Sequence, residues 1–225
     1  MLSPALLIGV FMDDNNLPVA REGLPFIFLF AFVTLIFAIL GWRCLATIGL
    51  LLSLFTVYFF RDPNRHCPVE EGSVVAPADG KIVFCGEVAE DKYFKGPAFK
   101  VSIFMSVFNV HVNRAPCDGK VIDTYYNKGE FLNASLDKAS LKNEQAGVWM
   151  KTDSGHDLLF VQIAGLIARR IVTYAGAGDS LKQGSRYGLI RFGSRVDVYF
   201  PSGSDIKVSL GDKTVAGESV LGLLK

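Results

Sequence analysis

The stretch Arg191-Phe192-Gly193-Ser194-Arg195-Val196-Asp197-Val198-Tyr199-Phe200-Pro201 indicates the fold most directly. Apolar residues alternate with other residues after Ser194, which predicts a β-strand with one buried face. The β-formers Leu189 and Ile190 lead in, so two strand pieces meet at Gly193-Ser194. Such a step is ordinarily a bulge or turn. It is also a minimal pair for a peptide bond that breaks itself, because Gly193 leaves its carbonyl open and Ser194 supplies a hydroxyl.

The chain from Ser73 onward repeats this pattern as short β-rich segments separated by Gly, Pro, Asp and Asn. Such spacing predicts a mainly β fold, an antiparallel sandwich or a barrel-like domain, rather than a βαβ fold. Phe131–Asn143 is the one segment that suggests a helix or a long loop. The predicted strands are Ser73–Ala76, Lys81–Val88, Phe99–Phe108, Lys120–Tyr126, Gly147–Thr152, Leu158–Ile163, Arg170–Tyr174, Gly188–Phe192, Arg195–Phe200 and Ile206–Leu210.

The N-terminal part has a different character. Leu24–Leu40 is an uncharged, largely apolar run of 17 residues, and Leu45–Phe60 is a second apolar run. Each is slightly shorter than the roughly 20 residues that span a bilayer as a helix. With Gly41-Trp42-Arg43 between them, the two runs predict a transmembrane or membrane-embedded helical hairpin. The alternative is a pair of buried core helices, but nothing else in the chain looks large enough to cover them.

The polar segment Arg61–Arg65 marks the predicted domain boundary, with a membrane segment over residues 1–60 and a catalytic β domain over 61–225. A hairpin puts both of its ends on one side of the membrane. Arg21, Arg61 and Arg65 lie at those ends, against Arg43 at the tip. The tendency of positive charge to stay inside then predicts a cell-membrane protein whose β domain is cytoplasmic.

Charge and cysteine content exclude several classes of protein. The chain of 225 residues has 23 basic and 22 acidic residues, which gives no argument for nucleic-acid binding. The four cysteines lack C-x-x-C spacing and the three histidines are scattered, so the sequence indicates neither a metal site nor a disulfide framework. We expect free thiols and no metal.

Three places carry residues suited to chemistry. Asp79 lies in a turn, Ala76–Gly80, where Asp before Gly is also ordinary turn chemistry. His111 follows a predicted strand, where a lone histidine among apolar residues is often structural. The third place is Gly193-Ser194. A serine hydroxyl needs a base to attack a carbonyl, and a histidine oriented by a carboxylate is the usual means. His111 and Asp79 fit those roles by type.

These places together, in this order, resemble the phosphatidylserine decarboxylases, specifically their short, membrane-associated form. The resemblance runs from Arg61 to about Val208. It rests on V-V-A-P-A-D-G-K-I at 74–82, F-N-V-H-V-N-R-A-P at 108–116, K-G-E-F-L-N-A-S-L-D-K-A-S at 128–140 and I-R-F-G-S-R-V-D-V-Y-F-P at 190–201.

The resemblance implies a proenzyme that cuts itself between Gly193 and Ser194 and turns Ser194 into a pyruvoyl group. A β chain of residues 1–193 and an α chain of residues 194–225 would then stay associated, and a homodimer is a possible assembly. The pyruvoyl ketone would withdraw electrons from a bound phosphatidylserine as CO2 leaves, yielding phosphatidylethanolamine. His111 is also the candidate proton donor to the resulting carbanion.

The chain departs from the longer family members at one place. They carry a second histidine three positions after the first, where this chain has Arg114. His111 therefore serves self-cleavage, reprotonation or both. Arg114 either binds the substrate phosphate or carboxylate, or is a solvated strand-end arginine. Asn133 lies in the matching 128–140 segment and is a further candidate for substrate binding.

Two other functions remain open at this stage. Archaetidylserine, a diether lipid, carries the same head group as phosphatidylserine and would undergo the same chemistry. A-P-A-D-G-K-I also resembles lipoyl- or biotinyl-carrier domains, which need no catalysis. Those carriers modify a lysine that typically lies beside Met, and Lys81 has no such neighbour.

Overall fold

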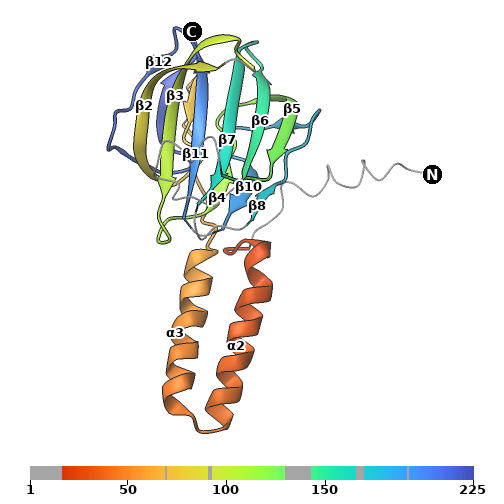
Figure 1. Ribbon diagram of the computed structural model, residues 1–225, viewed down its shortest axis with the longest axis vertical. Helices are drawn as coiled ribbons and strands as arrows, with labels where there is room; N and C mark the ends of the chain where they lie inside the picture. The colour runs from red at the N-terminus through yellow and green to blue at the C-terminus, as the bar shows by residue number, and fades with distance from the viewer. Residues whose placement is uncertain (1–16, 69, 91–92, 130–142, 166–169, 192) are drawn as a thin grey trace, which may run out of the picture. The chain divides into compact units, whose positions relative to one another are not determined.

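The computed structural model describes residues 17–68, 70–90, 93–129, 143–165, 170–191 and 193–225. The chain divides into two compact units, one comprising residues 15–64 and the other containing residues 65–225. The first is a helical hairpin and the second is built from β-strands (Figure 1). The predicted change of character between the N-terminal part and the rest of the chain is therefore present in the fold.

The hairpin consists of a short 3-10 turn, η2 (Arg21–Gly23), and two helices, α2 (Leu24–Ile39) and α3 (Arg43–Phe59). Gly41 turns the chain between the helices with a φ of +72°, a conformation that suits glycine. The Oγ atoms of Thr34 and Ser53 lie 3.3 Å apart between the helices. Arg21–Ile39, 19 residues with a mean hydropathy of 2.2, is long and apolar enough to cross a membrane, and α3 is shorter.

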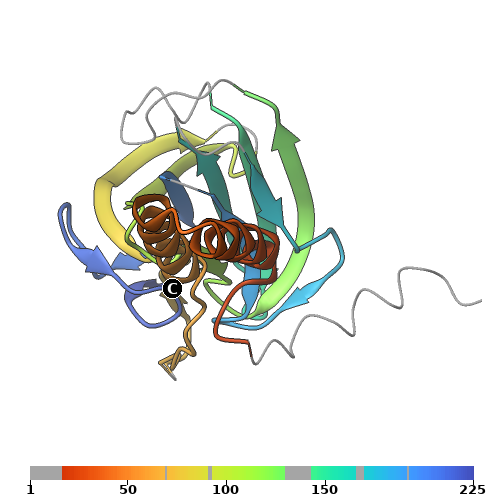
Figure 2. The ribbon, with the colours of Figure 1, turned by 90° about the horizontal axis from the view of Figure 1, so that it is seen from below.

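An antiparallel sheet of eight strands forms most of the β unit, in the order β13-β2-β3-β11-β7-β6-β5-β9. Figure 2 shows that the sheet curls into a half-barrel. β11 lies in its interior, paired with β3 on one side and β7 on the other. These strands are β2 (Gly80–Glu90), β3 (Gly96–Met105), β5 (Gly119–Asn127), β6 (Gln145–Thr152), β7 (Asp157–Ala164), β9 (Ser180–Leu181), β11 (Ser194–Pro201) and β13 (Lys213–Thr214).

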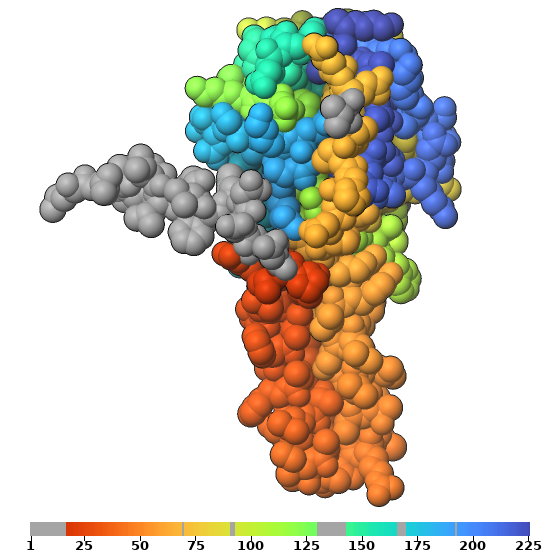
Figure 3. All heavy atoms as spheres, turned by 180° about the vertical axis from the view of Figure 1, so that it is seen from behind, coloured from red at the N-terminus to blue at the C-terminus, as the bar shows by residue number. Residues whose placement is uncertain are grey.

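Two three-stranded antiparallel sheets complete the unit. One has the order β4-β10-β8 and the other β1-β14-β12. Figure 3 shows the chain near β1 running beside the C-terminal segment, in agreement with the pairing of β1 and β14. These strands are β1 (Ser73–Val75), β4 (Val112–Arg114), β8 (Ile171–Thr173), β10 (Arg186–Ile190), β12 (Asp205–Ile206) and β14 (Val220–Leu223).

The hydrophobic core lies between the eight-stranded sheet and the smaller sheets. Val196 and Val198 of β11 pack in it together with Val74 of β1, Tyr187 of β10 and Leu221 of β14. The apolar residues that alternate along β11 therefore face this core, and the residues between them face the opposite side of the sheet. The predicted mainly β, antiparallel, barrel-like fold with an apolar helical segment before it is confirmed.

Nine of the ten predicted strands correspond to observed strands, whereas the predicted strand Ile206–Leu210 coincides with β12 only at Ile206. The strand predicted at Phe99–Phe108 ends at Met105, because Ser106–Asn109 forms a turn in which the Asn109 side chain accepts hydrogen bonds from Ser106. The strands that the pattern did not indicate, β4, β9, β13 and β14, have two to four residues each. Residues 131–142 of the predicted helix or long loop, Asn133 among them, lie outside the described residues.

Candidate active site

Ser194 is the first residue of β11, and its side chain is fully buried. It pairs in register with Met105 of β3 and Ala164 of β7, both of which belong to the core. Strand alternation therefore places Ser194 on the same concave face as Val196. Within the described part of the chain, its Oγ has no hydrogen-bond partner. A buried hydroxyl without a partner is costly and is typical of a functional site.

Gly193 precedes this strand with a φ of +61°, and a Cβ added to it would meet nothing within 4 Å. A left-handed backbone here favours glycine over other residues. The bond that the sequence singled out thus joins a left-handed glycine to the first residue of a strand. The strand holds the serine side of the bond, while space is open beside the glycine.

Backbone hydrogen bonds bring the segments of the other two candidates to this region. The amide of Ile190, four residues before Ser194, donates to the carbonyl of His111 at 3.3 Å. The amide of Arg114 donates to the carbonyl of Pro77 at 2.9 Å, which joins the His111 segment to the turn that carries Asp79. The structure therefore gathers all three sequence-predicted segments, although they are far apart in the chain.

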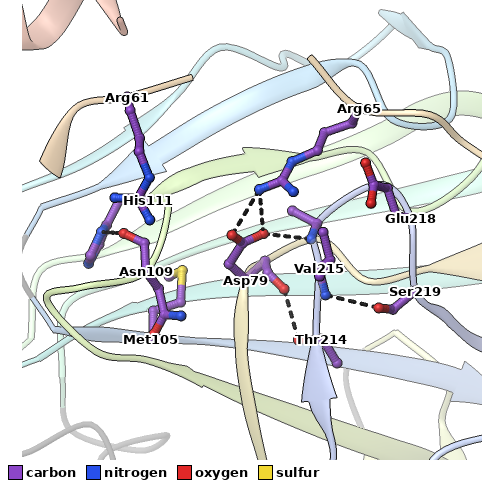
Figure 4. A network of polar contacts seen from close by, with 12 residues as sticks. Arg61, Arg65, Asp79, Met105, Asn109, His111, Thr214, Val215, Glu218 and Ser219 are labelled. Carbon is purple, nitrogen blue, oxygen red and sulfur yellow. Dashed lines mark hydrogen bonds and ion pairs between the residues drawn. The ribbon is translucent and has the colours of Figure 1, made fainter. Parts of the chain in front are cut away.

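His111 is fully buried in the connection between β3 and β4. Its Nδ1 lies 2.9 Å from the carbonyl oxygen of Asn109 (Figure 4). A carbonyl oxygen only accepts, so this hydrogen bond places the proton of the neutral ring on Nδ1 and makes Nε2 the basic nitrogen. The tautomer of His111 is therefore set by a backbone carbonyl oxygen two residues earlier in the same turn.

Asp79 is held by other groups. Nη2 of Arg65 donates to its two carboxylate oxygens at 2.9 and 2.8 Å, and the amide of Ala216 donates to Oδ1 at 2.7 Å (Figure 4). Thr214 donates to the carbonyl of the preceding residue, Ala78, at 3.0 Å. These contacts fix the turn from both sides. The predicted pairing of Asp79 with His111 stays a prediction.

The setting of Arg114 bears on one of the two alternatives considered above. Its side chain is buried, with 6% of the residue exposed, and Nη1 donates to the carbonyl of Gly184 at 2.9 Å. The interpretation as a solvated arginine is therefore wrong, because β4 lies inside the unit and pairs with β10. Its role in binding substrate stays a prediction.

Sequence reasoning missed several polar residues around this region. Arg65 belongs to a segment taken as a linker, and Asn113 lies in the His111 motif without having been singled out. Gln162 did carry a signal, since it is the one polar residue in the apolar run Leu158–Ala164. Over the described residues, no group of three or more His, Cys, Asp or Glu side chains is placed to hold a metal ion.

A buried ion pair lies on the opposite face of β11. Nε of Arg195 is 2.8 Å from Oδ1 of Asp197, and both residues are almost completely buried. Burial of the phenol raises the pKa of Tyr199 on the same face, and Asp197 adds a smaller contribution. The strand that begins at Ser194 is therefore covered on both faces as well as paired along both edges.

Comparison with known proteins gives the family. The model of the family described as phosphatidylserine decarboxylase matches residues 52–222, which is most of the chain. The chain belongs to the phosphatidylserine decarboxylase family. It is therefore an enzyme of a carboxy-lyase family, and its site should be judged by what that chemistry requires.

Individual relatives agree with the family model. The chain is 58% identical to the phosphatidylserine decarboxylase proenzyme of Syntrophotalea carbinolica over 214 residues, 95% of this chain and 100% of the relative. It is 53% identical to the proenzyme of the same name from Citrifermentans bemidjiense over 219 residues, and 49% identical to that of Geotalea uraniireducens over 213. Each alignment covers 95% of this chain and 100% of the relative. These three relatives are thus named as proenzymes.

Proposed function

We propose that this chain cleaves itself between Gly193 and Ser194 and then decarboxylates phosphatidylserine to phosphatidylethanolamine, using a pyruvoyl group derived from Ser194. The observation that carries the proposal is the buried Oγ of Ser194, unbonded within the described residues, next to a left-handed glycine. The names of the relatives support the substrate and the proenzyme state. They also favour the diacyl lipid over a diether lipid.

The first step is attack by Ser194 Oγ on the carbonyl carbon of Gly193. His111 is the proposed base, because the contact of its Nδ1 with a carbonyl oxygen makes Nε2 the basic nitrogen of the neutral ring. The C–O bond forms, the hydroxyl proton goes to His111, and the C–N bond then breaks with a proton returned to the nitrogen of Ser194. The product is an ester in place of the peptide bond. Elimination then breaks the bond between Cβ of Ser194 and the ester oxygen, which leaves a carboxylate on Gly193 and a dehydroalanine at position 194. Water hydrolyses the imine form of that residue, ammonia leaves, and the pyruvoyl ketone remains at the start of the second chain.

The residues around Ser194 fit a pyruvoyl group at this position. Its site would lie on the concave face between Met105 and Ala164, at the beginning of a strand that is paired on both edges. When present, a pyruvoyl group supplies a ketone that withdraws electrons from a bound substrate amine as CO2 leaves. In that reaction His111 holds and delivers the proton, and the buried surroundings exclude water from the reacting atoms.

The two chains produced by cleavage would remain one molecule. Residues 194–225 include β11, β13 and β14, and each of these pairs with a strand from residues 1–193. Val196, Val198 and Phe200 of β11 also lie in the common core. Separation would expose this core, so the proposed α and β chains should purify together.

Intact-mass measurement tests this proposal. The purified protein should contain a C-terminal fragment of 32 residues whose first residue is a blocked pyruvoyl group. Ser194→Ala should remain full length and inactive, because it has no attacking hydroxyl. A homogeneous, uncut wild-type chain that still decarboxylates phosphatidylserine would contradict the mechanism. A single chain with added mass on Lys81 would instead support the carrier alternative.

We also propose that the hairpin embeds the enzyme in the membrane that holds its lipid substrate. Phe28 and Leu51 are 69% and 61% exposed, which is unfavourable in water but favourable in lipid. The positions of Arg21, Arg61 and Arg65 support a cytoplasmic β unit. The full chain should stay with membranes after an alkaline wash, and residues 65–225 alone should be soluble and still cleave. A truncated chain that folds but stays uncut would show that the hairpin takes part in maturation.

A further inference from the structure

Three polar side chains form a connected row on the concave side of the β unit. Gly188 of β10 lies between Asn113 of β4 and Thr173 of β8 in register. The amide group of Gln162, from β7, lies over Gly188. A Cβ added to Gly188 would stand 2.7 Å from Nε2 and 3.2 Å from Oε1 of that amide. The glycine therefore leaves the space that Gln162 occupies between its two neighbours.

The hydrogen bonds in this row set the direction of each group. Thr173 Oγ1 donates to Gln162 Oε1 at 2.7 Å, and Gln162 Nε2 donates to Asn113 Oδ1 at 2.8 Å. The side-chain oxygen of Asn113 is thereby fixed toward Gln162, and its Nδ2 must point the other way. There it lies 3.7 Å from the sulfur of Met105. Asn113 and Gln162 are both fully buried.

The register of the sheet places this amide beside Ser194. Met105 pairs with Ser194 on the β3 side of β11, and Gln162 pairs with Val196 on the β7 side. Asn113 contacts both Met105 and Gln162, so its amide reaches across the concave face of β11 close to its first residues. A thioether is only a weak acceptor. Asn113 Nδ2 is thus a buried donor whose described partner is a weak acceptor, and that partner, Met105, pairs in register with Ser194.

We propose that Asn113 Nδ2 donates a hydrogen bond to the Gly193 carbonyl oxygen as that oxygen gains negative charge during attack by Ser194. Gln162 and Thr173 are positioning residues that hold the amide in the donating orientation, and Gly188 provides the space for them. The inference rests on the proposed self-cleavage. It adds the group that stabilises charge on the carbonyl oxygen, while His111 takes the hydroxyl proton.

The physical reason for such a donor is the cost of the charge. When the C–O bond forms, the electron pair of the carbonyl moves onto its oxygen, and burial removes the water that would otherwise solvate it. A donor already oriented by the hydrogen bond from Gln162, which Thr173 orients in turn, needs no reorganisation at that moment. Removal of one such donor typically slows a reaction by about 100- to 1,000-fold.

The test is Asn113→Asp in the full chain, with cleavage followed over time after translation by gel and mass. The aspartate keeps the shape and still accepts from Gln162, but when ionised it cannot donate. We expect cleavage at about pH 8 to be slower than wild type by about 100-fold or more. The ratio of variant to wild-type rate should rise as the pH falls, because a protonated carboxyl donates again. Equal rates at about pH 8, or a slow variant whose ratio does not rise, would overturn the proposal.

Thr173→Val tests the positioning role separately. Loss of its hydroxyl leaves Gln162 free to turn, and we expect cleavage to slow by roughly tenfold. Thr152→Val is the matched control, because Thr152 is also buried but bonds to Ser154 and His156.

These variants separate failure of the inference from failure of the proposed function. If wild type is uncut, the proposed function is wrong. If wild type is cut and thermal unfolding shows that Asn113→Asp is folded, the pH profile of cleavage by Asn113→Asp decides whether Asn113 is the donor. If Asn113→Asp does not fold, Thr173→Val decides, and a rate equal to that of Thr152→Val would overturn the proposal.

Discussion

The hairpin and the β unit use similar apolar residues in opposite ways. In the hairpin, large side chains such as Phe28 and Leu51 are mostly exposed, and the Oγ atoms of Thr34 and Ser53 bond to carbonyls within their own helices. In the β unit, apolar side chains are buried and so is a set of polar ones, including Ser194. The difference is what the proposed membrane setting of the hairpin requires, since a helix in lipid must satisfy its polar groups locally. The β unit instead keeps polar groups in its interior, where the proposed chemistry would use them.

The largest expected effect concerns the buried polar groups of the β unit. His111→Ala should abolish cleavage at Gly193-Ser194, because the hydroxyl would lose its proposed base. The measurement is the cleaved fraction over time on a gel. His66→Ala and His156→Ala are the matched controls and should mature normally, since His156 lies in an exposed turn bonded to Ser154. Rapid, complete cleavage of His111→Ala would remove it from this role.

A matched pair of leucines tests the apolar half of the comparison. Leu158 in the core of the β unit is 0% exposed, and Leu51 in α3 is 61% exposed. Leu158→Ala should lower the free energy of unfolding of the β unit by about 2–5 kcal/mol through the cavity it leaves. Leu51→Ala should leave that free energy unchanged. Denaturant unfolding of both variants in the same detergent measures this, and equal losses would contradict the division into two units.

Asp79 and Arg65 provide the next prediction. Asp79→Asn should slow cleavage, and Arg65→Met should slow it less, because Asp79 would keep its bond from the Ala216 amide. Each variant breaks a charged hydrogen bond between side chains that are 12% and 14% exposed. We expect each to lower the free energy of unfolding by about 1.5–3 kcal/mol. Gel assays measure the cleavage rate, and thermal unfolding measures the loss of stability.

The three outcomes of that test have different meanings. Slower cleavage of Asp79→Asn alone would support the predicted pairing with His111. Equal slowing in Arg65→Met would show that Asp79 acts by fixing its turn through Arg65. Cleavage of Asp79→Asn at the wild-type rate would exclude both interpretations.

The sequence allowed the fold to be predicted because periodicity reports burial of alternate residues. This periodicity made the strands on either side of Gly193-Ser194 and the apolar hairpin predictable. Strands of two to four residues, such as β4, are too short to show a period. The contacts of Asp79 with Arg65 and of Asn113 with Gln162 depend on register between distant strands. A single sequence carries no signal for such pairings, although the position of Gln162 as the one polar residue in an apolar run could have marked it for attention.

The smallest expected effect compares one residue type in the two regions. Cys44 in α3 is exposed and Cys117 in the β unit is buried. Burial raises the pKa of the Cys117 thiol to about 12, with smaller contributions from Asp118 and Asp153. The folded chain therefore keeps this proton to higher pH than the unfolded chain, whose cysteines have pKa values of about 8.5. The stabilisation is complete below the unfolded pKa and is lost as the pH rises toward the folded one.

The free energy of unfolding of the β unit should thus fall above about pH 8.5, with Cys117 contributing up to about 1.4 kcal/mol per pH unit. Cys117→Ala should reduce this slope, because the thiol that the unfolded chain would ionise is gone. Cys44→Ala, the matched control from the hairpin, should leave the slope as it is in wild type. Denaturant unfolding at several pH values between about 8 and 10 measures all three chains. An unchanged slope in Cys117→Ala would mean that the Cys117 thiol of wild type ionises as readily in the folded unit as in the unfolded chain. Burial in the β unit would then not suppress ionisation, and the contrast with the exposed hairpin would fail for this residue type.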